Sequence, residues 1–455
     1  MTVIVRFAPS PTGRLHIGNI RTALLNWLFA HREGGTFLLR LDDTDRERST
    51  EAFADGIRED LDWLGLVWAR EERQSARMAR YAEAAAALKA SGRLYACYES
   101  EDELERRRSR QRARGLPPIY DRASLMLTAD DRQRLEAEGR RPHWRFRLAN
   151  TTPERGVAPE PTLVDWVDLI RGDQSIDIGS LSDPVLIRED GTPLYTFTSV
   201  VDDIDMTVTH VIRGEDHVTN TGVQIDLFQA LGASPPRFAH HSLLIAADGQ
   251  ALSKRLGALS IASLRDAGIE PMAIACHAAL LGTPEAITIY PDLSTLSQHC
   301  DLERVSRSPG RFDQAELQAL NGRLLHSLDF SIVETRLAEL AVGGGRAYWD
   351  AVRGNVTTLA DAVRWWQVVV GPTVPIIENA GMLADAAAVL PEEPWDEETF
   401  AAWTGAIRAK TGLKGRALFH PLRLALTGLE AGPELKALLP LIGRARTLER
   451  LTAAR

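Results

Sequence analysis

The sequence predicts an α/β protein with a parallel sheet, an inserted α+β domain and an all-α C-terminal region. A strand–helix–strand pattern fills residues 3–41, and it predicts a parallel pair because parallel strands need a crossover connection. The composition changes near Tyr95, and the parallel pattern resumes after residue 190. Strand patterns fade after about residue 255, and helical patterns continue to the end of the chain.

The elements of the parallel sheet follow from apolar spacing and from turn residues. VIVRF (3–7) is a short apolar run typical of a buried strand, and the loop after it contains two prolines and a glycine. The expected elements are, in chain order, this strand, a helix from Leu15 to about Ala30, a strand at 37–41, a helix at 49–64, a strand at 206–213, a helix at 219–231 and an apolar stretch at 242–246.

The segment 96–190 has a different character. Residues 99–142 are dense in Glu and Arg and hold few large apolar side chains, whereas HWRFRL (143–148) alternates like a half-buried antiparallel strand. We therefore expect an inserted domain over 96–190.

Length and composition exclude several protein classes. The 455 residues predict roughly three domains, and 44% hydrophobic with 25% charged residues is ordinary for a globular protein. No window approaches 18 uninterrupted apolar residues, and the N-terminus has no secretory h-region, so we expect neither a membrane span nor export. Three scattered cysteines without a CxxC pair favour a reducing cytoplasm and no structural zinc.

The charge is unevenly distributed. The chain carries 53 basic and 62 acidic residues, a net charge of −9, which argues only weakly against nucleic acid. Residues 106–114 (RRRSRQRAR) hold six arginines, and residues 405–455 hold ten Lys or Arg against three Glu. Either patch alone could be a solvated helix face, but with the motifs below RNA phosphate becomes the better explanation.

The first motif, PSPTGRLHIGN, joins a strand to a helix. A helix N-terminus offers free N–H groups and a positive dipole end to a phosphate. Gly18 leaves room for a ligand beside the backbone, and His16 can donate to a phosphoryl oxygen. Taken alone, a capping histidine beside a structural glycine is the commoner interpretation.

Three further motifs are also ambiguous when each is taken alone. LSKR (252–255) could place cations on a polyphosphate or be a basic surface turn. VIRGEDH (211–217) lies at the carboxyl end of a predicted parallel strand, where such folds bind ligands, but a surface ion-pair cluster would look similar. LRLDDTDRERS (39–49) could bind a metal or an ammonium group, or its acids could pair with its own arginines.

The order and spacing of these motifs resemble one family. FAPSPTGRLHIGNIRTAL, RLDDTDRERS, VVDDIDMTVTHVIRGEDH and ALSKRLG closely resemble glutamyl-tRNA synthetase of the bacterial type, among the class I aminoacyl-tRNA synthetases. HIGN is similar to that family's HIGH motif, and LSKR to its KMSKS loop. The resemblance implies a Rossmann-type catalytic domain (1–95 and 191–247), an acceptor-binding domain (96–190), a stem-contact region carrying LSKR (248–324) and a helical anticodon-binding region (325–455).

The implied reaction ligates L-glutamate to the 3′ end of tRNA through a glutamyl-adenylate, with ATP and Mg²⁺. Positioning and charge stabilisation should dominate its first step. By resemblance, His16 and Lys254 are catalytic. The residues that the resemblance implies for ATP are Pro9, Thr12, His16, Gly18, Asn19, Asp216, Ser253, Lys254 and Arg255.

The resemblance also implies a glutamate site. Arg6 and Arg213 match the positions that hold the side-chain carboxylate, which planar arginine binds in bidentate fashion. Glutaminyl enzymes, by resemblance, lack the second arginine, so Arg213 favours glutamate over glutamine. Asp42 matches the acid for the α-ammonium group, and the other implied contacts are Ser10, Tyr195 and Ser199.

The chain departs from the family pattern at several positions. Asp42 replaces a glutamate, Ser199 stands where some relatives have asparagine, and Ala251 replaces the first lysine of the KMSKS-like loop. Some relatives carry a cysteine zinc site in the insertion, whereas YACYES retains only Cys97, so we predict no zinc.

The expected nucleic-acid partner is tRNA-Glu, tRNA-Gln stays open as a second one, and the expected state is a monomer. Three alternatives stay open at this point. A truncated relative that glutamylates a modified tRNA base would lack the anticodon-binding part. A small-molecule nucleotidyltransferase would need neither the insertion nor the helical C-terminal region. A paralogue that binds tRNA without charging it is kept open by Ala251 and Asp42.

Overall fold

A computed structural model describes residues 2–150, 160–246, 249, 259–396 and 398–453. Packing divides the chain into two compact units. The first unit comprises Met1–Leu264 and Ile274–Asp313, and the second comprises Arg265–Ala273 and Gln314–Arg455. Among the described residues, no helix is long and apolar enough to cross a membrane.

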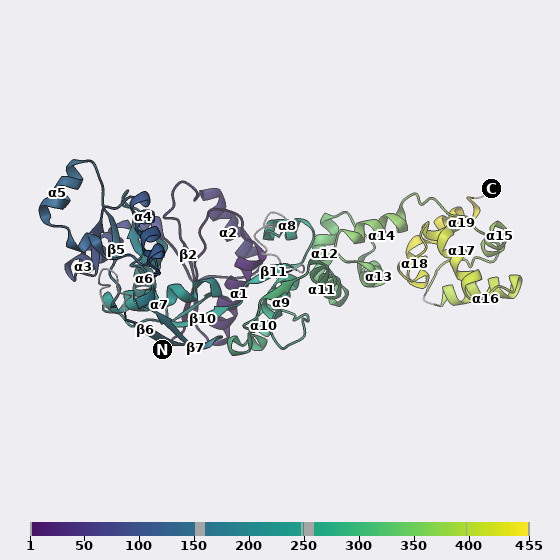
Figure 1. The fold of residues 1–455 in the computed structure, drawn as a ribbon. Coiled ribbons are helices and arrows are strands. Elements are labelled where there is room, and N and C mark those ends of the chain that lie inside the picture. The colour runs from purple at the N-terminus through teal and green to yellow at the C-terminus, as the bar shows by residue number, and fades with distance from the viewer. Residues whose placement is uncertain (1, 151–159, 247–248, 250–258, 397, 454–455) are drawn as a thin grey trace. The chain divides into compact units, whose positions relative to one another are not determined.

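The first unit is built around parallel strands, as predicted (Figure 1). One sheet has the order β1 (Ile4–Phe7), β2 (Thr36–Leu41), β3 (Arg70–Arg73), all parallel. A second has the order β7 (Gly172–Asp177), β6 (Leu163–Asp168), β10 (Arg237–His241), β9 (His210–Gly214). In this second sheet β9, β10 and β6 are parallel and β7 is antiparallel.

The two sheets meet at β1 and β9. The backbone N–H of Thr209 donates to the Ile4 carbonyl at 2.9 Å, and Ile4 N–H donates to the Thr209 hydroxyl at 2.8 Å. The chain order therefore reverses between these neighbouring strands. In open α/β sheets, ligands bind at the carboxyl ends of the strands on either side of such a reversal.

Helices connect and cover these strands. They are α1 (Ile17–Arg32), α2 (Glu51–Trp63), α3 (Met78–Ala90), α6 (Tyr195–Asp205) and α7 (Val218–Ala230). Their apolar faces contribute Tyr81, Phe197 and Leu227 to a core that also includes Phe146. The predicted helices at 15–30, 49–64 and 219–231 are thus confirmed within a few residues.

The segment 96–190 contributes to two sheets. An antiparallel sheet holds β4 (Leu94–Cys97), β5 (His143–Phe146) and β8 (Val185–Ile187), which confirms the predicted antiparallel strand at 143–148. The helices α4 (Glu101–Ala113) and α5 (Ala129–Ala137) lie between β4 and β5 in sequence.

The segment that forms β6 and β7 was expected to belong to the inserted domain, and these two strands were not predicted. Asp168 of β6 pairs with Phe238 of β10, so this hairpin extends the sheet formed by the flanking segments. A strand edge exposes unpaired N–H and C=O groups, and the hairpin covers part of this edge of β10, where the Leu169 N–H donates to the Phe238 carbonyl at 2.9 Å. The domain boundaries at 95/96, 190/191, 247/248 and 324/325 stay predictions, although the packing divides the chain differently.

Residues 244–312 contain short elements. They are β11 (Leu244–Ala246), α8 (Ile261–Asp266), α9 (Pro271–Leu280), α10 (Leu293–His299) and β12 (Gly310–Phe312). β11 and β12 form a parallel pair, so a strand occurs where only helical patterns were expected.

The C-terminal part of the second unit, from Gln314 onward, is helical, as predicted. Its helices are α11 (Gln314–Ser327), α12 (Phe330–Glu339), α13 (Gly345–Val352), α14 (Asp361–Val370), α15 (Ala380–Ala388), α16 (Thr399–Thr411), α17 (Arg416–Thr427), α18 (Leu435–Ile442) and α19 (Arg444–Thr452). Trp349 and Trp403 are fully buried in its core. Both indole N–H groups donate to backbone carbonyls at 2.9 Å, which satisfies their polar atoms.

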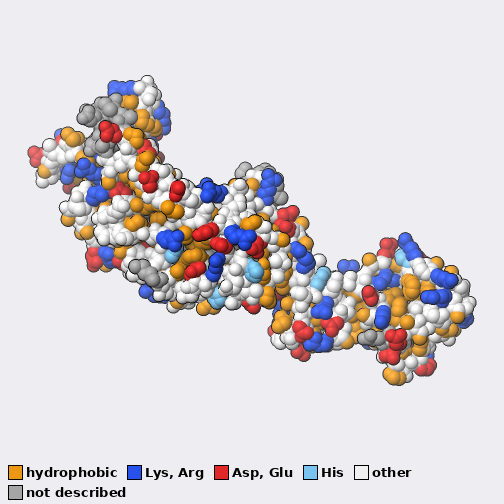
Figure 2. Space-filling view, turned by 90° about the horizontal axis from the view of Figure 1, so that it is seen from below, with side chains coloured by type: hydrophobic (Ala, Val, Ile, Leu, Met, Phe, Trp, Pro, Cys, Tyr) orange, Lys and Arg blue, Asp and Glu red, His pale blue; other side chains and the backbone are white. Residues whose placement is uncertain are grey.

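Charges of both signs are mixed on the surface. Figure 2 shows acidic and basic side chains interspersed over the face that it draws. This mixing agrees with a chain of 53 basic and 62 acidic residues.

Candidate functional site

A cavity of about 860 Å³ lies in the first unit where β1 and β9 end and α1 begins. It is therefore at the reversal of strand order. Most of the predicted site residues that the structure describes line it, and these are Arg6, Pro9, Ser10, Thr12, His16, Gly18, Asn19, Asp42, Tyr195, Arg213 and Asp216.

Among the predicted site residues that the structure describes, Ser199 does not line the cavity. Ser199 is fully buried, and its hydroxyl donates to the Tyr195 carbonyl at 2.7 Å and accepts from Gln224 at 2.8 Å. Ser253, Lys254 and Arg255 lie outside the described residues, as does Ala251.

His16 caps the N-terminus of α1. Its Nδ1 accepts from the Gly18 N–H at 3.1 Å, and the Asn19 side chain accepts from the His16 backbone N–H at 3.2 Å. A Cβ on residue 18 would lie 3.0–3.1 Å from the His16 ring, so glycine keeps the ring in place. Burial lowers the pKa of His16, so the ring is neutral near pH 7 and offers its other nitrogen as a donor.

The flanks of the LSKR loop approach the same helix end. Backbone bonds join Ile17 to Leu259 at 3.2 Å and Ile261 to Leu15 at 3.0 Å. On the other flank, Leu243 and Leu244 line the cavity. The described residues on one side of the segment 247–258 are therefore bonded to the N-terminus of α1, and those on the other side line the cavity.

A buried network of arginines and aspartates forms one wall. Arg40 donates to Asp42 at 2.7 Å and to Asp203 at 2.7 Å, and Arg6 donates to Asp203 at 3.1 Å. Burial raises the pKa of Asp42 to about 6 although Arg40 opposes that shift. The arginines reverse the effect of burial on Asp203 and lower its pKa.

Arg213 lies opposite a different set of groups. Its Nε donates to His240 at 3.2 Å, one terminal nitrogen to the Tyr195 hydroxyl at 3.0 Å, and the other to the Thr221 hydroxyl at 2.7 Å. Among the described residues, no carboxylate pairs with this guanidinium, which is 5% exposed. Burial lowers its pKa, but arginine stays protonated at neutral pH. A buried cation without a counter-ion favours an anionic ligand.

Several residues of the site were not predicted from the sequence. Asp203 was quoted only within a motif, and His240 and Asp168 were not singled out. Each of these three residues lies beside apolar residues that are typical of a buried core. Two adjacent acids directly after the apolar pair Val200 and Val201, namely Asp202 and Asp203, were the available signal, because buried acids are rare unless paired.

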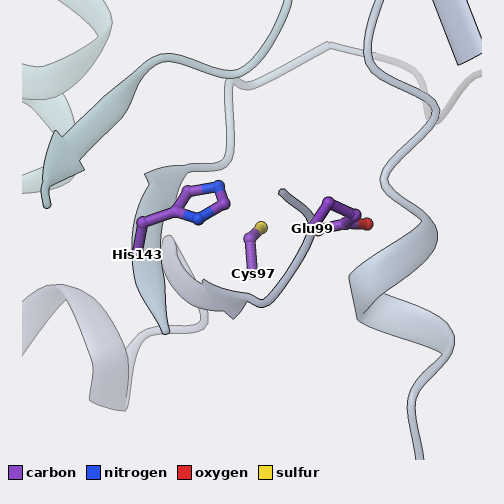
Figure 3. A group of neighbouring side chains, drawn as sticks. All are labelled: Cys97, Glu99 and His143. Carbon is purple, nitrogen blue, oxygen red and sulfur yellow. The ribbon is translucent and has the colours of Figure 1, made fainter. Parts of the chain in front are cut away.

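The side chains of Cys97, Glu99 and His143 converge in the insertion, with ligand atoms within 4.8 Å of one another (Figure 3). They do not fit a structural zinc site, which takes four ligands. Burial raises the pKa of the Cys97 thiol to about 12, and both Glu99 oxygens already accept, from Tyr120 at 2.7 Å and Ser124 at 2.8 Å. The absence of zinc stays a prediction, which elemental analysis of the purified protein tests.

The chain is similar to known proteins along its whole length. Residues 2–319 match the family model of the class I tRNA synthetase catalytic domain (E and Q), and residues 349–455 match an anticodon binding domain. A glutamate–tRNA ligase 2 of Methylobacterium radiotolerans is 58% identical over 453 residues, 99% of each chain. A glutamate–tRNA ligase 1 of Brucella ovis is 55% identical over 456 residues, 99% of this chain and 100% of that protein.

A crystal structure shares the fold. It is that of a glutamate tRNA ligase from Elizabethkingia meningosepticum in complex with its amino acid. The similarity covers 100% of this chain and 99% of that chain, with a TM-score of 0.86 at 27% sequence identity.

Proposed function

This chain belongs to the class I tRNA synthetases for glutamate and glutamine, and we propose that it ligates L-glutamate to the 3′ end of tRNA-Glu. The named relatives are glutamate–tRNA ligases over essentially the full chain. The single observation in the site that supports glutamate is Arg213, a buried guanidinium without a carboxylate partner among the described residues.

Arg213 and Arg6 select the side chain of the substrate. Arg213 needs an anion, and a carboxylate accepts two parallel N–H bonds from a guanidinium. Arg6 is already bonded to Asp203 and adds positive charge beside the same cavity. Glutamine would leave the charge of Arg213 unpaired, so it is rejected without a separate editing site.

The α-amino end of glutamate faces acceptors on the other wall. Asp42 keeps acceptor capacity beyond its bonds to Arg40, because a carboxylate has about four lone-pair sites. Ser10 and Tyr195 also line the cavity and complete the glutamate contacts. Ser199 acts through Tyr195, whose carbonyl it contacts at 2.7 Å.

ATP lies along the N-terminus of α1. The free N–H groups and dipole of this helix, together with His16, stabilise negative charge on the phosphates. Pro9, Thr12, Gly18, Asn19 and Asp216 line the space for the nucleotide. Ser253, Lys254 and Arg255 supply further contacts to the phosphates from a segment whose described flanks line the cavity or bond to this helix.

Magnesium fits the donors of this site only as a partner of the nucleotide. Asp216 lines the cavity with its side chain 55% exposed, and Mg²⁺ typically takes one or two carboxylates plus phosphate oxygens and waters. When bound, the ion neutralises charge on the phosphates.

The reaction then proceeds in two steps. An oxygen of the glutamate α-carboxylate attacks the α-phosphorus of ATP, and the bond to pyrophosphate breaks. A hydroxyl of the terminal tRNA adenosine next attacks the acyl carbon, the bond to AMP breaks, and the hydroxyl proton passes to the departing phosphate or to water. The protein supplies position and charge in the first step, which needs no proton transfer.

The rest of the chain holds the tRNA. We assign the acceptor end to the segment 96–190 with its arginine-rich helix, the stem to 248–324 and the anticodon loop to 325–455. The match of an anticodon domain to 349–455 argues against the truncated relative and the small-molecule nucleotidyltransferase. We further propose a cytoplasmic monomer. The charging assay decides whether tRNA-Gln is a second substrate.

Replacement of Arg213 by glutamine tests the proposed function. Loss of two charge-assisted hydrogen bonds should raise the KM for glutamate by about 100-fold or more, with tRNA affinity unchanged. Arg93→Gln is the matched control, because Arg93 pairs with Asp226 and does not line the cavity. An unchanged glutamate KM in Arg213→Gln would contradict the assignment.

A further inference from the structure

A second pair of buried residues lies behind Arg213. His240 is on β10 and Asp168 ends β6, and the two are 0% and 2% exposed. The distance between His240 Nδ1 and Asp168 Oδ2 is 2.5 Å. The other oxygen of Asp168 accepts three backbone N–H groups, from Ile170 at 3.0 Å, Arg171 at 2.9 Å and His240 at 3.1 Å. Hydrogen bonds to both carboxylate oxygens therefore fix the orientation of the Asp168 side chain.

The fixed aspartate determines which nitrogen of His240 carries the proton. An ionised carboxylate only accepts, so Nδ1 is the donor of the pair. In the neutral ring Nε2 is then an acceptor, and this nitrogen lies 3.2 Å from Nε of Arg213 and 2.9 Å from the Thr221 hydroxyl. His240 thus connects Asp168 to the guanidinium without presenting a second N–H to it.

The contacts of Arg213 leave a defined pair of donors. A guanidinium has five N–H groups, and three of them are used by His240, Tyr195 and Thr221. One N–H remains on each terminal nitrogen. A carboxylate can accept both, whereas a neutral amide offers only one oxygen and brings its own N–H donors.

We propose that Asp168 and His240 are positioning residues that hold Arg213 so that its two remaining N–H groups face the substrate side chain, and that they thereby set the preference for glutamate over glutamine. The inference rests on the proposed function, because it assumes that Arg213 binds the glutamate side chain. A guanidinium fixed at three of its N–H groups cannot turn to suit an amide, and a site with fixed donors rejects a ligand that cannot accept from them.

Asp168→Asn tests the role of the aspartate. The asparagine oxygen keeps the three backbone bonds, so its NH₂ faces Nδ1 and forces the proton of His240 onto Nε2. The N–H of His240 Nε2 and the N–H of Arg213 Nε then point at each other, so their hydrogen bond is lost. The KM for glutamate should rise by about 10-fold to 100-fold, the discrimination against glutamine should fall, and the KM for ATP should not change. Asp226→Asn is the matched control, since Asp226 is a buried aspartate bound to Arg93 and to the Ala149 N–H, and it does not line the cavity.

Two substitutions of His240 distinguish a role in positioning Arg213 from a role in folding. His240→Gln retains an acceptor near the place of Nε2 and should preserve most of the glutamate affinity, whereas His240→Leu should reproduce the defect of Asp168→Asn. The readout is ATP–pyrophosphate exchange with tRNA present, at varied glutamate, glutamine and ATP. Thermal unfolding of each variant confirms that it is folded.

The outcomes distinguish this inference from the function on which it rests. If the wild-type protein showed no glutamate-dependent ATP–pyrophosphate exchange, the proposed function itself would be contradicted. Active wild type with Asp168→Asn and His240→Leu both within about twofold of its glutamate KM would overturn only the positioning role. Equal increases in the KM for glutamate and for ATP would also overturn it, because a general disturbance of the cavity would then explain the defect.

Discussion

Single side chains at the N-terminus of α1 depend on one another. His16 keeps its position because residue 18 has no side chain. We predict that Gly18→Ala lowers kcat/KM for ATP by about 10-fold or more, since a displaced His16 loses one charge-stabilising contact. Gly56→Ala is the control, because a Cβ at this helical position meets nothing within 4 Å. Equal activity of both variants would show that His16 does not need this geometry.

The pKa of Asp42 predicts how glutamate use depends on pH. Burial raises this pKa to about 6, so the carboxylate is ionised above pH 6 and becomes protonated below it. A protonated Asp42 no longer attracts the α-ammonium group, which stays charged throughout this range. The value of kcat/KM for glutamate should therefore fall about tenfold per pH unit below pH 6, following the titration of the free enzyme.

The same measurement on Asp42→Asn provides the comparison. That variant should be weak at every pH and should lack the step near pH 6, while kcat/KM for ATP should show no such step in either protein. A flat glutamate profile in the wild type between pH 7.5 and pH 5 would show that the ionisation of Asp42 is not required.

The site residues within motifs could be predicted from the sequence, whereas the buried residues that form hydrogen bonds to them could not. Arg6, His16, Asp42 and Arg213 lie in motifs with a recognisable order, and they all line the cavity. Asp203 and His240 lie far along the chain from the groups they contact. Nothing in a local pattern states that Arg6 will meet an acid 197 positions away.

Elements were predictable where their apolar spacing was regular. The helices α1, α2 and α7 match their expected ranges within a few residues. α2 buries one face, whereas α7 is buried on all sides from Thr221 to Phe228. The strand β3 was not predicted, since its sequence REER has no apolar residue. It forms because β2 offers a parallel edge beside it. Tertiary pairing thus overrode local propensity at β3.

The helix α4 carries a stripe of exposed arginines. Arg106, Arg110 and Arg114 follow one another at intervals of four residues and have no partner among the described residues, whereas Arg107, Arg108 and Arg112 pair with Asp121 or Glu105. Side chains at this spacing share a helix face. This stripe is the candidate contact to tRNA phosphates.

Substitution of the stripe separates RNA binding from glutamate activation. Glutamine at 106, 110 and 114 should weaken tRNA binding and reduce the slope of log affinity against log salt by about 2 to 3, because each phosphate contact releases about one counterion. The KM for glutamate at saturating tRNA should stay the same. The control, glutamine at 107, 108 and 112, removes the same charge from the paired positions and should have a smaller effect. Equal losses of tRNA affinity in both triple variants would mean that tRNA binding depends on net charge alone and not on the unpaired stripe.

At the scale of the whole molecule, the chain combines two units with different construction. The first unit places a cavity at a reversal of strand order, and the second is a helical assembly around buried tryptophans. The fold class could be predicted because strand and helix periods differ along the chain. The division at residue 313 could not, because helical patterns continue across it without a change in composition.

The attachment of labelled glutamate to purified tRNA-Glu and tRNA-Gln, each with ATP, tests the central claim most directly. We predict ATP-dependent charging of tRNA-Glu with glutamate and none with labelled glutamine. Charging of tRNA-Gln as well would assign a relaxed anticodon reading to the second unit. Failure to charge either tRNA, with tRNA binding intact, would contradict the claim and would make the protein a tRNA-binding paralogue.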